Sequence, residues 1–186
     1  MNNPTDTDPR YDPRSIGLHW LTAALVIVLW ALGQTIDWFG KGDPRTMARS
    51  VHISLGVILG GVLAARLWWR GHGGTRLAPA GTGRLDALAV HMHTLLYVLL
   101  VVTVMLGVAN AWVRGDALFH LLTIPAFDPD NKSLRTNVED LHALAANALF
   151  ILAALHAAAG LAHHLVFKDT VLRRMMPRGA RRSGRS

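Results

Sequence analysis

The chain has 186 residues, of which 51% are hydrophobic, and it contains no cysteine. Without cysteine there can be no disulfides, iron–sulfur clusters, thiolate zinc sites or covalently attached c-type haem. The net charge of +7 is compatible with nucleic-acid binding, but the apolar residues gather in four runs of roughly 20 or more. In such a membrane chain, basic residues beside the helices set orientation, so we expect no nucleic-acid partner.

Four membrane-spanning helices are predicted in chain order. Residues 1–15 form a polar segment without the features of a removable signal peptide, and Ser15 is a candidate cap of the first helix. The predicted domain covers residues 16–168, followed by a basic tail at 169–186. Its helices are expected at about 16–38, 50–69, 85–113 and 140–167. The fold class is therefore an all-α, integral membrane four-helix bundle.

The longest loop, residues 114–139, contains the sequence ALFHLLTIPAF. This stretch is predicted to lie at the membrane interface as a short amphipathic segment. Lys and Arg are more frequent in the two terminal segments and the second loop than in the other two loops. The positive-inside rule then places both termini in the cytoplasm, and the basic tail could also touch anionic lipid.

Four histidines are candidates for metal binding inside the membrane, where an ionisable side chain is costly and suggests function. His142 and His156 are 14 residues apart on the last helix, so they share a face and stand about 21 Å apart along its axis. By depth, His156 pairs with His19 on the first helix, and His142 pairs with His52 on the second. Each pair could clamp a b-type haem between helices.

Residue size one turn beyond each of these histidines supports the same choice. A macrocycle needs room beside its ligand, and the residue four positions on is always small. These small residues are Ala23, Gly56, Ala146 and Gly160. Small residues also serve ordinary helix packing, and the alternative for the histidines is a buried imidazole bonded to backbone or water.

Further polar residues lie near the two predicted haems. His93 could bond a propionate or a quinone head group, or it could be a satisfied core histidine; His163 is expected at the cytoplasmic headgroup level and is a second candidate for a quinone or proton site. Haem propionates could be neutralised by three arginines, which could equally snorkel to the interface. These are Arg66 and Arg70 at the inner haem, and Arg114 at the outer one.

From about Ser15 to Pro177 the chain resembles the bacterial cytochrome b561 family. The similarity rests on SIGLHWLTAALVI, VHISLGVILGGVLAARLWWR, HTLLYVLLVVTVMLGV, LTIP, LHALAANALFILAALHAAAGLAHHLVFKD and TVLRRMMPR. The resemblance implies a multi-pass protein of the bacterial inner membrane with two haems b, whose ligands fall on the four histidines chosen above. It also implies the superoxide oxidase type, which oxidises superoxide at the outer face and passes electrons to ubiquinone.

Three functions remain open on the sequence alone. The first is an oxidoreductase that transfers electrons from superoxide through two haems to ubiquinone. The second is an electron-transfer subunit that relays electrons between a redox partner protein, such as a dehydrogenase or hydrogenase, and quinone. The third is a structural or transport membrane protein without haem. Reduction by superoxide, co-purification of a partner and the colour of the protein distinguish them.

Overall fold

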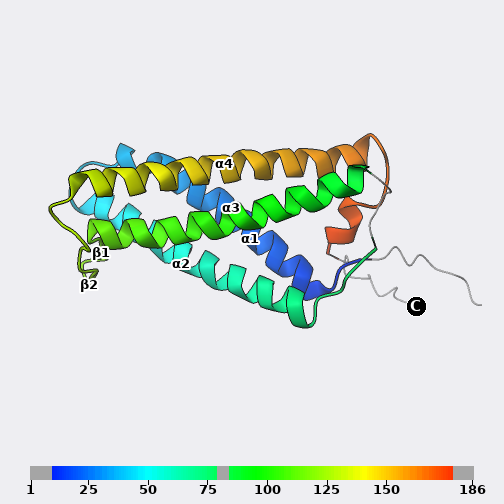
Figure 1. Ribbon diagram of the computed structural model, residues 1–186, viewed down its shortest axis with the longest axis horizontal. Helices are drawn as coiled ribbons and strands as arrows, with labels where there is room; N and C mark the ends of the chain where they lie inside the picture. Colours follow the sequence, from blue (N-terminus) through cyan, green and yellow to red (C-terminus); the bar gives the residue numbers. More distant parts are fainter. Residues whose placement is uncertain (1–9, 79–83, 178–186) are drawn as a thin grey trace, which may run out of the picture.

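A computed structural model describes residues 10–78 and 84–177 as an elongated bundle of four long helices (Figure 1). These helices are α1 (Pro13–Thr35), α2 (Asp43–His72), α3 (Arg84–Arg114) and α4 (Lys132–Leu165). All four are long and apolar enough to cross a membrane, with mean hydropathy between 1.7 and 2.2. The predicted all-α membrane bundle is confirmed. The predicted segments 1–15 and 169–186 lie partly outside the described residues.

Two pairs of helices build the bundle: α3 packs along α4, and α1 packs along α2, with α2 also touching α3. A leucine core holds the pairs together. It comprises Leu25, Leu29, Leu59, Leu63, Leu100 and Leu149. Many large apolar side chains instead lie on the outside, including Val57, Met105 and Ile151. A helix that is apolar on all sides is suited to a lipid bilayer.

Helix starts differ from the sequence expectation at three places. Asp12, not Ser15, caps α1: its carboxylate accepts the Ser15 backbone N–H at 2.9 Å and the Ser15 hydroxyl at 2.7 Å. α2 begins at Asp43 instead of near residue 50, and α4 begins at Lys132 instead of near residue 140. The added turns are polar, so hydropathy gives no sign of them.

One end of the bundle, called the hairpin end, carries the two-stranded hairpin of β1 (Ala117–Leu118) and β2 (Leu122–Thr123). The short 3-10 helix η1 (Ile36–Trp38) follows α1 at this end. Ser50, fully buried on α2, fixes the hairpin because its hydroxyl accepts the Phe119 N–H at 2.9 Å. The expected amphipathic segment is therefore a hairpin, whose tip exposes Leu121.

The other end, called the termini end, joins the start of α1, the end of α2 and the 3-10 helix η2 (Leu172–Met175) (Figure 1). The indole of Trp20 on α1 donates to the Met175 carbonyl at 2.8 Å. Asp12 also accepts the Trp69 indole N–H and the Thr75 N–H, each at 3.0 Å. Asp12 thus links α1 to the end of α2 and to the loop that follows.

Burial alone would raise the pKa of the Asp12 carboxyl, but hydrogen bonds from Ser15, Thr75 and Trp69 outweigh it and hold that pKa below its ordinary value of 3.8. We predict that Asp12→Ala lowers the free energy of unfolding in detergent by about 1–2 kcal/mol at neutral pH, as for loss of a helix cap. Circular dichroism during denaturation measures this loss.

Because the pKa is lowered by folding, the contribution of Asp12 is complete above its ordinary pKa and fades as pH falls below it. The gap between wild type and Asp12→Ala should therefore shrink below about pH 4. Asp140→Ala, which removes an exposed carboxylate on α4, is the control. An equal loss of stability in both variants would contradict a specific role for Asp12.

Candidate functional site

Two pairs of histidines face each other inside the bundle, at two levels. Near the termini end, His19 of α1 meets His156 of α4 with ring centroids 6.3 Å apart and ring planes at 77°. Near the hairpin end, His52 of α2 meets His142 of α4 at 6.2 Å and 89°. The structure brings together the same pairs that helix direction and depth predict. Because His142 and His156 share α4, this helix contributes to both levels.

The spacing of each pair suits one metal atom held between two imidazoles. Two metal–nitrogen bonds of about 2 Å and two ring radii add to roughly 6 Å. Within the described part of the chain, no group of three or more His, Cys, Asp or Glu residues could hold a bare metal ion. A metal with only two protein ligands needs its remaining ligands from another source, and a haem macrocycle supplies four.

Glycines make room for the imidazoles of the hairpin-end pair. A Cβ on Gly107 of α3 would lie 3.1 Å from His142 Cε1, and a Cβ on Gly33 of α1 would lie 3.5 Å from His52 Cε1. His142 Nδ1 lies 3.2 Å from the Thr103 carbonyl, so it can donate there and keep Nε2 free for a ligand. His52 Nδ1 is buried and makes no well-formed hydrogen bond within the described residues.

The termini-end pair has more polar neighbours. Arg66 Nη2 lies 3.0 Å from His19 Nδ1, and because arginine only donates, this nitrogen must accept. Iron bound through Nε2 would then leave His19 without a ring proton, unless Arg66 turns away. His93 of α3 is a third imidazole, with its centroid 5.1 Å from that of His156. The prediction that His93 lies near the inner pair therefore agrees with the structure.

The sequence predicts room for a macrocycle beside four small residues, and the structure shows how much space surrounds two of them, Gly56 and Gly160. A Cβ added at Gly56 would meet nothing within 4 Å, so the space one turn beyond His52 is open. A Cβ at Gly160 would lie 3.8 Å from Leu172 of η2, so part of the space beyond His156 is taken by protein. Ala23 and Ala146 are both half-buried. Room beside the ligand is thus clearest at the hairpin end.

The arginines predicted to meet propionates have protein partners. Arg66 and Arg70 lie over the Tyr97 ring, at 5.1 and 5.7 Å. Arg114 donates to Glu139 at 2.6 Å and lies 3.6 Å from Asp116. A propionate would have to share these guanidinium groups with their present partners.

Asp116 is the centre of a charged cluster at the hairpin end, which the sequence did not reveal. Its buried carboxylate lies 3.3 Å from Arg49 and 3.6 Å from Arg114. Desolvation raises the pKa of the Asp116 carboxyl, although both arginines oppose the shift. The cluster therefore neutralises part of the positive charge at the hairpin end within the protein.

His163 lies apart from both histidine pairs. Its Nδ1 contacts Asp169 at 2.5 Å, just beyond the end of α4. Burial opposes ionisation of Asp169, but bonds from His163 and from the Val171 N–H hold the pKa of this carboxyl below its usual range. This dyad joins α4 to the segment that leads into η2.

An aromatic stack lies between the two levels and was also missed by sequence reasoning. The rings of Trp30 on α1 and Phe150 on α4 are 3.9 Å apart and nearly parallel, at 6°. The Trp30 indole donates to the Asn147 side chain at 2.9 Å, which Gln34 also reaches at 3.2 Å. Trp30 lies 11 residues after His19, close to three turns, so both can share a face of α1.

These features define a helical membrane protein whose histidine pairs, half-buried between the helices, fit haem. The sequence model of prokaryotic cytochrome b561 matches residues 10–178. The chain therefore belongs to the prokaryotic cytochrome b561 family, as its motifs suggested. The family implies haem b and a role in membrane electron transfer, which places the protein among the oxidoreductases.

This chain aligns with nearly the whole length of several curated relatives. Cytochrome b561 homolog 1 of Escherichia coli K12 is 29% identical over 173 residues, 91% of this chain and 98% of the relative. A probable superoxide oxidase, CybB, of Yersinia pestis is 29% identical over 171 residues, 91% and 97% of the two chains. Cytochrome b562 of Cereibacter sphaeroides is 30% identical over 174 residues, which cover 91% of this chain and 96% of the relative.

The glycine contacts give a test of the hairpin-end site. We predict that Gly107→Ala lowers haem content or alters the visible spectrum, because its Cβ would press on His142. Gly33→Ala should have a smaller effect, since its Cβ would sit at an ordinary contact distance from His52. Gly61→Ala, where a Cβ meets nothing within 4 Å, is the control. Unchanged spectra in all three variants would contradict the tight fit at Gly107.

Proposed function

We propose that this protein is a di-haem cytochrome that oxidises superoxide at the periplasmic side of the bacterial inner membrane and delivers the electrons to ubiquinone. The observation that supports it most is the pair of facing imidazoles at each of two depths. Each bound haem b supplies one-electron chemistry at its iron. His52 and His142 would hold the outer haem, and His19 and His156 the inner one.

The residues of the chain position the cofactors and control access to them. Two imidazoles would hold each haem iron from the protein side, and the haem would supply one-electron transfer without a substrate binding the metal. His142 is oriented by the Thr103 carbonyl, and Gly107 leaves room for its ring. The apolar bundle excludes water around both pairs, which tunes the potential of a buried haem.

Electron and proton balance requires two superoxide ions for each quinone. Each superoxide loses one electron and leaves as dioxygen; two electrons and two protons then convert ubiquinone to ubiquinol. His93, beside His156, could donate a hydrogen bond or proton to a quinone near the inner haem. His163, held by Asp169, is the second candidate for proton delivery at that end.

The excess of Lys and Arg at the termini end supports an orientation with both termini in the cytoplasm. The hairpin end then faces the periplasm. Arg45, Lys132 and Arg135 belong to this end, where Arg45 pairs with Asp37. A positive field there would attract an anionic donor. The name of the Yersinia pestis relative points to the same donor.

An electron-transfer subunit is the second candidate, because the same helices and haems would serve a partner protein. In that case a dehydrogenase or hydrogenase would replace superoxide as donor or accept electrons from quinol. The family match supports this function equally well. The exposed hairpin tip at Leu121 offers such a partner a surface.

Single substitutions should separate the two haems. His52→Ala and His142→Ala should each remove the same haem, because one missing ligand breaks a two-ligand site. His19→Ala and His156→Ala should each remove the other. Redox titration followed by visible spectroscopy measures which haem remains. His91→Ala is the control, since His91 Nδ1 contacts the Ala87 carbonyl of its own helix. Loss of the same haem in His52→Ala and His19→Ala would refute the pairing.

The donor is tested with the purified protein in the absence of any partner. Oxidised protein should show reduced b-type bands when mixed with a superoxide source, and these bands should fade when ubiquinone is added. Superoxide dismutase should block the first change. Bands that appear only with dithionite would count against superoxide as donor and favour the partner-subunit function.

A further inference from the structure

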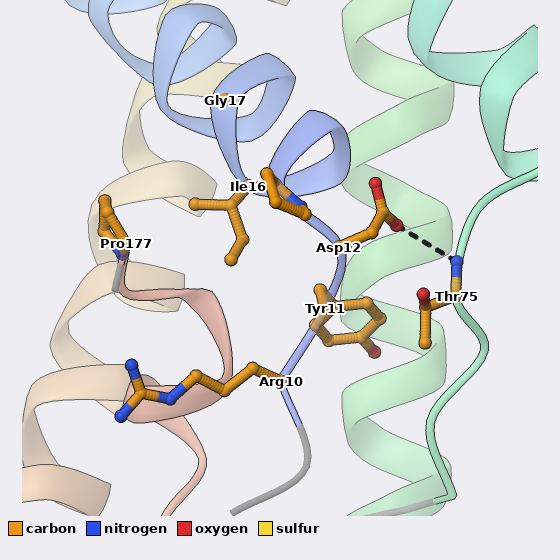
Figure 2. Close-up of a pocket in the computed structure, with 8 residues that line it drawn as sticks. Arg10, Tyr11, Asp12, Ile16, Gly17, Thr75 and Pro177 are labelled. Atoms are coloured by element: carbon orange, nitrogen blue, oxygen red, sulfur yellow. Dashed lines mark hydrogen bonds between the residues drawn. The ribbon is translucent and has the colours of Figure 1, made fainter. Parts of the chain in front are cut away.

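A cavity of about 450 Å³ lies at the termini end, on the side of α1 where the N-terminal segment enters (Figure 2). Four separate parts of the chain form its walls: the N-terminal segment, the first turn of α1, the loop after α2 and the segment after η2. Its volume is in the range of small-molecule sites, about 300–1,000 Å³. It is separate from both histidine pairs, none of whose members lines it.

The cavity combines apolar walls with one cation, Arg10, that has no partner among the described residues. Ile16, Tyr11 and Pro177 surround it, with Arg10 along its edge (Figure 2). Arg10 makes no hydrogen bond or ion pair with any described residue. Its neighbour Asp12 is not available as a partner, because its carboxylate already accepts bonds from Ser15, Trp69 and Thr75. An anion is therefore the natural ligand for the guanidinium.

Three other charged groups at this end have partners of their own. Arg14 lies over the Trp69 ring at 4.7 Å, and Arg174 donates to the Ala78 carbonyl at 2.8 Å. Asp169 is bound by His163 and by the Val171 N–H. Among the described residues, this end thus holds further arginines, and the carboxylates of Asp12 and Asp169 already have partners. This balance disfavours a cationic ligand.

Gly17 forms part of the cavity wall on α1. A Cβ added there would meet nothing within 4 Å, so the space beside this helical glycine is open. α1 begins at Pro13 and its length of 23 residues corresponds to about 34 Å, close to the thickness of the hydrocarbon core. Residues 10–17 therefore straddle the boundary between lipid headgroups and acyl chains.

We propose that this cavity binds the headgroup of an anionic phospholipid, with its phosphate on Arg10 and the start of an acyl chain beside Ile16 and Gly17. The lipid would join the N-terminal segment, the loop after α2 and the segment after η2 around one ligand. Basic pockets beside membrane helices suit such headgroups. The site does not depend on haem or on the redox partner.

The test uses the full-length protein in detergent, with lipid binding counted by native mass spectrometry and thermal unfolding followed in parallel. Dioleoylphosphatidylglycerol should bind and raise the unfolding temperature, whereas dioleoylphosphatidylcholine, which has no net charge, should do so weakly. Arg10→Gln should weaken phosphatidylglycerol binding about tenfold or more, the loss expected for a charge-assisted bond. Arg10→Lys should retain part of it.

A second variant fills the cavity without removing charge. Gly17→Leu should abolish binding, because its side chain enters the open space. Gly61→Leu is matched to it, since a Cβ at this helical glycine of α2 also meets nothing. Arg76→Gln is matched to Arg10→Gln, as another basic residue at the same end. Both controls should bind as wild type does, and circular dichroism verifies that each variant folds.

Five results would overturn the proposal. Equal stabilisation by inorganic phosphate would indicate a free-anion site, and equal binding of phosphatidylcholine would exclude charge recognition. Displacement of phosphatidylglycerol by a short-chain ubiquinone would assign the cavity to quinone. Equal weakening by Arg76→Gln would indicate general surface attraction. A photoreactive phosphatidylglycerol should label residues 10–17 in wild type, and labelling only elsewhere would also count against the site.

Discussion

The placement of four half-buried imidazoles between apolar helices is the constraint on which the rest of the structure depends. A polar ring inside a bilayer must find partners, and the bundle supplies them unequally. His142 reaches a backbone carbonyl and His19 reaches Arg66, while His52 Nδ1 has no well-formed hydrogen bond in the part of the chain that the structure describes. Each ring also faces a second imidazole across the bundle. A metal shared by each pair would use the nitrogens that protein bonds leave free.

Much of this arrangement follows from the sequence because it depends on hydropathy along the chain and on the position of each histidine within its helix. Hydropathy locates the spans, and helices that alternate in direction bring His19 level with His156 and His52 level with His142. Contacts across helices have no such signal, so Gly33 and Gly107 were not recognised. The capping residue was misassigned because Asp12 and Ser15 both suit that role and lie in one turn. The early starts of α2 and α4 escape hydropathy since they are polar.

Family membership fixes the cofactor class, whereas the electron donor depends on the ends of the bundle. Relatives at 29–30% identity carry different names, including a probable superoxide oxidase and a cytochrome b562. At the hairpin end, Arg49 forms an ion pair with Asp116, and Arg114 forms ion pairs with Asp116 and Glu139. A positive field at the hairpin end therefore depends on its other basic residues, such as Lys132 and Arg135.

The number of haems per polypeptide tests the central claim most directly. Haem b extracted from the purified protein is quantified by its pyridine complex, and the polypeptide by amino-acid analysis. Two separate histidine pairs predict two haems for each chain. A ratio of one would show that one of the pairs holds no haem, and a ratio near zero would contradict both sites.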